Sequence, residues 1–132
     1  LQKAAPVYIS REIKGADGKT EALEIDEDFD RAWRRVGVGL DRVGLNIEDR
    51  DRSAGIYYIR YLDPDYEVKK RNDEGLFSRW FSKEKPVDAP LYRVKLVSDG
   101  NKTTVTAMPD SDKTDPLSTS ARILNLLQEQ VR

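Results

Sequence analysis

The chain has 132 residues, the size of a single domain, and its 23 basic and 24 acidic side chains give a net charge of −1. It contains no His and no Cys, which excludes thiolate nucleophiles, disulfides and metal sites built on imidazole or thiolate. With no excess of positive charge and no histidine base, we expect neither nucleic-acid binding nor catalysis.

No apolar run is long enough to span a bilayer, and no signal peptide is visible. The chain begins at Leu1, so we expect it to be an excerpt of a longer or processed protein. A signal or anchor that had been removed would not be visible in such an excerpt.

The N-terminal part of the chain predicts extended structure and then a turn. Residues 1–21 are expected to be a linker or an extra edge strand, because an extended stretch precedes the turn sequence at residues 15–18. Residues 22–132 are expected to form one domain. At its start, Leu23 and Ile25 alternate with acidic residues, which predicts a short, half-buried strand.

The clearest predicted element is a helix that begins near Phe29. Asp26 or Asp28 can cap its start, and Gly44 is placed for a left-handed residue at its end. One face is apolar, with side chains at helical spacing: Phe29, Trp33, Val36, Leu40 and Val43. The helix therefore has a single side to bury.

Two glycines, Gly37 and Gly39, lie inside this helix and need a reason, since each costs about 1 kcal/mol relative to alanine. We interpret them as a close approach of the helix to the sheet. A dinucleotide-binding loop is the alternative, but it needs a glycine where Arg42 stands and a strand-to-helix turn.

Alternating apolar and polar residues predict further strands around turns at residues 53–55 and 99–102. The pattern gives the sheet one buried and one wet face, which is typical of antiparallel sheets, so helices should cover one side. A second helix is expected to begin at Asp115-Pro116 and to run to the end of the chain. Its apolar stripe is Leu117, Ala121, Leu124, Leu127 and Val131. The fold class is therefore α+β.

A long polar loop at residues 63–90 carries an apolar group with helical spacing between basic residues. The group is Leu76, Phe77, Trp80 and Phe81. It could fold back over the domain's own sheet, dock into a partner protein, or anchor at an anionic membrane. We predict these four residues as a partner-binding site.

No motif predicts a metal, a cofactor or a catalytic residue. Asp49, Asp51 and Ser53 imitate the start of a calcium loop, but Ala54 and Arg60 replace the glycine and glutamate it needs. We therefore expect no cofactor and no metal.

The stretch from Leu23 to Leu62 resembles the NlpB, or BamC, family of outer-membrane assembly lipoproteins. The residues that carry the resemblance are Phe29 with Trp33, Leu40 to Gly44, and Asp49, Arg52, Ser53 and Gly55 leading into Tyr57, Ile59 and Tyr61. They form a pattern of packing and turns rather than of chemistry.

The resemblance implies a helix-grip domain, in which a curved antiparallel sheet packs against a long helix and a C-terminal helix. It also implies a place on the periplasmic side of the bacterial outer membrane, with a lipid anchor outside this chain. The implied partners are other subunits of the β-barrel assembly (BAM) complex, and no family catalytic residue exists to carry over.

Our hypothesis is a non-enzymatic domain that acts by protein–protein interaction. A second candidate surface is the groove between the first helix and the sheet, bordered by Trp33 and Tyr57. Two alternatives stay open: a helix-grip module that holds a small apolar ligand between helix and sheet, and a hydrolase or lyase that uses carboxylates and tyrosine. The enzyme would need a buried acid with a raised pKa near Tyr57 or Tyr61.

Overall fold

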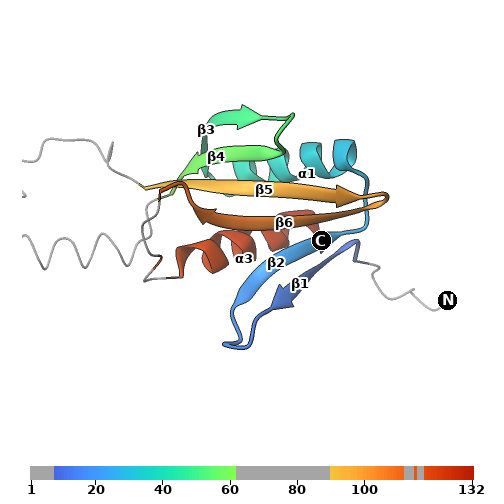
Figure 1. Cartoon of the computed structure of the whole chain (residues 1–132), viewed down its shortest axis with the longest axis horizontal. Helices are drawn as coiled ribbons and strands as arrows, with labels where there is room; N and C mark the ends of the chain where they lie inside the picture. The colour runs from blue at the N-terminus through green and yellow to red at the C-terminus, as the bar shows by residue number, and fades with distance from the viewer. Residues whose placement is uncertain (1–7, 62–89, 112–114, 116–117) are drawn as a thin grey trace, which may run out of the picture.

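A six-stranded antiparallel sheet with strand order β1-β2-β6-β5-β4-β3 forms the body of the domain (Figure 1). The computed structural model describes residues 8–61, 90–111, 115 and 118–132. The strands are β1 (Ser10–Lys14), β2 (Thr20–Ile25), β3 (Asn46–Asp51), β4 (Ile56–Arg60), β5 (Leu91–Asp99) and β6 (Lys102–Pro109). The N-terminal strand β1 is an edge of the sheet, and β2 begins at Thr20.

Both described helices, α1 (Phe29–Arg42) and α3 (Thr119–Val131), lie on the same face of the sheet (Figure 1). Helix α3 packs on β1, β2 and β6, whereas α1 packs on β3, β5 and β6, and the two helices contact each other. The prediction of an α+β fold, with an antiparallel sheet covered by helices on one face, is confirmed.

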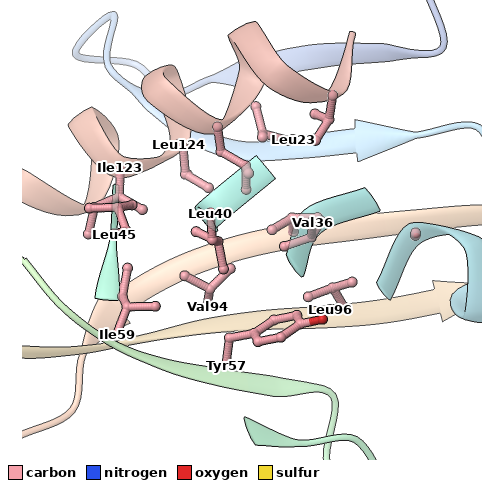
Figure 2. Packing of buried hydrophobic residues seen from close by; sticks show 14 of the residues in the cluster. Leu23, Val36, Leu40, Leu45, Tyr57, Ile59, Val94, Leu96, Ile123 and Leu124 are labelled. Carbon is pink, nitrogen blue, oxygen red and sulfur yellow. The ribbon is translucent and has the colours of Figure 1, made fainter. Parts of the chain in front are cut away.

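The core forms where the apolar stripes of the helices meet the inward-facing strand residues. Figure 2 shows Val36 and Leu40 of α1 among side chains from the strands and from α3. The residues predicted to face inwards on β5 are all buried: Tyr92, Val94 and Leu96. Alternation along the strands therefore identified the buried face correctly.

Helix α1 begins and ends as its sequence predicts. Asp28 is the N-cap, and its carboxylate accepts a hydrogen bond of 3.1 Å from the backbone N–H of Arg31. After Val43, Gly44 adopts a φ of +77°, the left-handed conformation that glycine tolerates best. Of the two predicted caps, Asp28 rather than Asp26 makes the contact.

Helix α3 begins at Thr119, three residues after the start at Pro116 that the sequence predicts. The Asp115 carboxylate accepts hydrogen bonds of 2.9 Å from the backbone N–H groups of Thr119 and Ser120, so it caps the helix from outside its first turn. Between them lies Ser118, whose φ of +53° is not helical. The buried stripe also differs from the predicted one, because Ile123 is fully buried while Ala121 is only half-buried.

The capping carboxylate predicts a defined pH dependence. Burial raises the pKa of Asp115, but hydrogen bonds from Ser120, Thr119 and Tyr92 outweigh it, so the pKa lies below its ordinary value of 3.8. The carboxylate therefore stabilises the fold above pH 3.8, and this stabilisation is lost as the pH falls through the lowered pKa. We expect Asp115→Asn to cost about 1 kcal/mol near pH 7.

The measurement is urea unfolding of both proteins between pH 7 and pH 2.5. The difference in unfolding free energy should shrink below pH 3.8, because the wild-type carboxyl group becomes neutral there. Asp99→Asn, at an exposed position in β5, is the control and should leave the unfolding free energy nearly unchanged. A constant difference at all pH values would contradict the assigned role.

Candidate partner-binding surface

The predicted groove between α1 and the sheet is filled with side chains at Trp33 and Tyr57. Their rings stack with centroids 3.9 Å apart, and the Tyr57 hydroxyl donates a 2.7 Å hydrogen bond to the Trp33 carbonyl oxygen. Only 6% of Trp33 and 2% of Tyr57 is exposed. In this arrangement little of the surface of either side chain is accessible to a partner protein.

Gly37 allows this close contact between helix and sheet. A Cβ atom at this position would lie 2.6 Å from the Tyr57 hydroxyl oxygen, well inside van der Waals distance. The interpretation of Gly37 as a close approach of helix to sheet is confirmed. Gly39 is different, because its Cβ would meet Leu127 of α3 at 2.8 Å. For Gly39 the predicted contact with the sheet was wrong, since the neighbour is the other helix.

The acidic turn after β3 is structural. The Asp51 carboxylate accepts hydrogen bonds from the Ser53 hydroxyl at 2.7 Å and the Ala54 N–H at 3.1 Å. The Ser53 hydrogen bond is the main reason why the pKa of Asp51 is lowered. Arg52 reaches Asp30 of α1 in an ion pair of 2.6 Å. The turn therefore ties the β3–β4 hairpin to α1.

Gly55 joins the same turn to the neighbouring strand β5. It adopts a φ of +72°, and its carbonyl oxygen accepts a 2.7 Å hydrogen bond from the N–H of Leu96. A Cβ on Gly55 would lie 2.5 Å from the Leu96 carbonyl oxygen. The residues of the acidic turn are thus explained by backbone geometry. Within the described residues, no group of three or more acidic side chains could hold a metal ion.

The predicted partner-binding residues Leu76, Phe77, Trp80 and Phe81 lie outside the described residues. The structure does describe both ends of the stretch that contains them. The N–H of Tyr61 donates a 3.3 Å hydrogen bond to the carbonyl oxygen of Pro90, directly beyond the last pair of β4 and β5. The stretch therefore leaves and re-enters the sheet at one point.

Surface hollows lie elsewhere on the described part of the chain, and two of them are well defined. The smaller, about 330 Å³, is found where the end of α1 meets β3. The larger, about 660 Å³, lies between the β1–β2 hairpin and the start of α3. We call it the hairpin cleft, and its lining residues are Glu12, Lys14, Gly18, Lys19, Thr20, Ser118, Ala121, Arg122 and Asn125.

Sequence reasoning missed the hairpin cleft. Arg122 is about a hundred positions from Lys14 and Lys19, and the two lysines fall in the segment expected to be a linker or an edge strand. The signal that could have found it was the Gly15–Gly18 turn with a lysine on each side, which indicates a hairpin with two cations near its tip. Nothing in the sequence alone places α3 beside it.

Fold and surface together define an α+β domain of the helix-grip type, with a packed helix–sheet interface. The model of the family described as the outer membrane protein assembly factor BamC-like C-terminal domain matches residues 12–131. The chain belongs to this family, as its resemblance predicted.

Individual relatives agree with this assignment. The chain is 40% identical over 130 residues to the outer membrane protein assembly factor BamC of Accumulibacter regalis, covering 96% of this chain and 33% of that protein. It is 41% identical over 126 residues to BamC of Thiobacillus denitrificans, covering 93% and 34%. The chain thus spans about a third of the length of these relatives. None of its described helices is both long and apolar enough to cross a membrane.

Proposed function

We propose that this domain is a non-enzymatic accessory part of the BAM complex, which inserts β-barrel proteins into the bacterial outer membrane, and that it acts by binding other protein subunits. Family membership over residues 12–131 is the observation that carries the proposal. The same reasoning gives a place on the periplasmic side of the outer membrane, with a lipid anchor outside this chain.

The chemistry of the described residues supports a role without catalysis. The enzyme alternative needs an acid with a raised pKa near Tyr57 or Tyr61, yet the carboxyl groups with shifted values, Asp26, Asp51 and Asp115, are all shifted downwards. The pKa of the Tyr57 hydroxyl is raised by burial, which keeps it neutral, and it is engaged with the Trp33 backbone.

Packing gives no support to the alternative of a small apolar ligand. Such a ligand needs an enclosed apolar space between helix and sheet, usually of several hundred Å³. In the described part of the domain, Val36, Leu40 and Tyr57 fill this region (Figure 2). Both described hollows lie at the surface, and none of Val36, Leu40 and Tyr57 lines either of them.

For the contact itself we propose the apolar group Leu76, Phe77, Trp80 and Phe81. Large aromatic residues dominate the energetics of many protein interfaces, and these are flanked by basic residues in the sequence. The hydrogen bond between Tyr61 and Pro90 supports an experiment that removes the whole stretch without disturbing the sheet.

Replacing residues 62–89 by Asn-Gly, together with Pro90→Thr to supply the N–H that closes the turn, should leave a two-residue hairpin between β4 and β5. We expect the domain to stay as stable or to gain up to about 2 kcal/mol, because a shorter loop costs less closure entropy. In cells, the otherwise full-length protein with this change should lose most of its co-purification with BAM subunits. Stability is measured by urea unfolding and binding by quantitative mass spectrometry.

A second variant separates the apolar group from the length of the stretch. Serine at positions 76, 77, 80 and 81 keeps the length and should lower co-purification as much as the deletion does. If both variants instead lose several kcal/mol of stability, the group packs against the domain itself. Unchanged co-purification in both would refute these residues as the contact.

A further inference from the structure

The hairpin cleft combines basic side chains from two parts of the chain that are distant in sequence. Three of its nine lining residues are cationic, Lys14, Lys19 and Arg122, against one acidic residue, Glu12. The chain as a whole has a net charge of −1, so this surface has the opposite sign to the molecule. A local reversal of this kind attracts anionic partners and guides their approach.

A register shift in the hairpin builds one wall of the cleft. The side chain of Leu23 in β2 faces the helices. In a regular strand, side chains two residues apart face the same side, so the side chain of Glu21 would also face the helices. The shift between Ile13 and Lys14 pairs Lys14 with Thr20 instead. The buried Thr20 hydroxyl then donates a 2.6 Å hydrogen bond to the Asn125 side-chain oxygen on α3. The register shift thereby places the neutral side chain of Thr20, and not the acidic side chain of Glu21, at this wall of the cleft.

The opposite wall holds hydrogen-bond donors in place. Since the Asn125 oxygen accepts from Thr20, the NH₂ group of the same amide is left to serve an incoming acceptor. The Lys19 ammonium donates to the Ser118 hydroxyl across the cleft, which fixes this cation beside the start of α3. Asn125 and Lys19 therefore have partners within the domain before any ligand arrives, which lowers the entropic cost of binding.

From these features we infer that the hairpin cleft binds an acidic, extended segment of a partner protein. This rests on the proposed protein-binding function and adds the chemistry of one partner segment. A volume of about 660 Å³ exceeds what one carboxylate or phosphate needs and falls in the range of clefts that hold larger ligands. Aspartate and glutamate side chains spaced along a strand supply acceptors for both lysines and for the Asn125 amide.

A membrane surface fits the cleft less well than a peptide. Interfacial binding needs apolar side chains that enter the acyl region beside the cations. The lining residues include one apolar side chain, the half-buried methyl group of Ala121. Apart from Ala121 and Gly18, the lining side chains are polar or charged, as a peptide of alternating acidic residues requires.

The test uses the 132-residue chain and a fluorescein-labelled ten-residue peptide of alternating glutamate and serine. Fluorescence anisotropy at 50 mM and 200 mM salt gives its affinity, with a glutamine–serine peptide as the neutral comparison. We expect the acidic peptide to bind at least about tenfold more tightly than the neutral one at low salt, and less tightly at high salt. Equal binding of both peptides would overturn the inference.

The Lys14→Glu/Lys19→Glu variant should weaken binding of the acidic peptide by about tenfold or more. The matched control is Arg31→Glu/Arg34→Glu, which makes the same change in charge at two exposed positions of α1. It should change binding by less than about threefold, and circular dichroism confirms that both variants are folded. An equal loss in the control would mean attraction to net charge alone, which contradicts a specific cleft.

Two further readouts separate the possible failures. Vesicles with anionic lipids test the other occupant: if the cleft variant loses vesicle binding while peptide binding is unchanged, the cleft is a lipid site and the inference is wrong. Co-purification of the full-length protein with BAM subunits tests the proposed function by itself. That function would survive if co-purification persists although the acidic peptide fails to bind.

Discussion

Replacing Gly55 by alanine is expected to lower the unfolding free energy by about 3 kcal/mol, an effect found only where a substitution meets backbone or core. Two penalties combine. A side chain at a φ of +72° costs about 1 kcal/mol, and its Cβ would lie 2.5 Å from the Leu96 carbonyl oxygen. A backbone carbonyl in the middle of a sheet cannot move aside as a flexible side chain can.

Gly100 provides the matched control. It lies in the β5–β6 turn with a φ of +61°, and a Cβ there would have no atom within 4 Å. Gly100→Ala should therefore cost only the conformational term, about 1 kcal/mol. Urea unfolding of both variants isolates the contact with Leu96. Equal losses of unfolding free energy in the two variants would show that β5 moves to accommodate the new Cβ atom, and that the turn at Gly55 is less rigid than we infer.

Truncating Tyr57 to alanine is expected to cost about 4 kcal/mol. The substitution removes the ring stacked on Trp33, empties the space beneath Gly37, and removes the hydrogen bond to the Trp33 carbonyl oxygen. Most of the cost comes from the cavity. Tyr57→Phe, which keeps the ring, should cost only about 1 kcal/mol.

The adjacent residue is the natural comparison. Tyr58 has the same side chain on the same strand but faces the opposite side of the sheet, and it is half-buried. Tyr58→Ala should cost less than about 1.5 kcal/mol, because no closed cavity forms there. Thermal unfolding of the three variants measures all these effects. A loss at Tyr58 as large as at Tyr57 would mean that the outer face of the sheet is also packed.

The sequence predicted the elements whose pattern is set locally. Alternation identified the buried side of β5, and helical spacing with Asp28 and Gly44 bounded α1. It misplaced the start of α3 because Asp115 caps that helix through a turn that holds Ser118 in a left-handed conformation. In the sequence, an aspartate that caps a helix from several residues away looks the same as one that stands directly before the first turn.

Candidate surfaces were harder to predict than elements, because they depend on which elements become neighbours. Trp33 and Tyr57 were predicted to border a groove, and in the structure their rings stack and both side chains are buried in the core. The hairpin cleft depends on a register shift at Ile13 and on α3 lying beside the hairpin. No local pattern of residues encodes either.

The strand order has a consequence for how the molecule assembles. Strand β2, near the start of the chain, pairs with β1 on one side, but its other neighbour is β6, so Leu23 pairs with Val105 across most of the polypeptide. Contacts so distant along the chain slow folding, since a large loop must close before any pairing rewards it. Until β6 has been synthesised, the edge of β2 is unpaired and the apolar face of the β1–β2 hairpin is exposed. Unpaired strand edges and exposed apolar surface are features that chaperones protect.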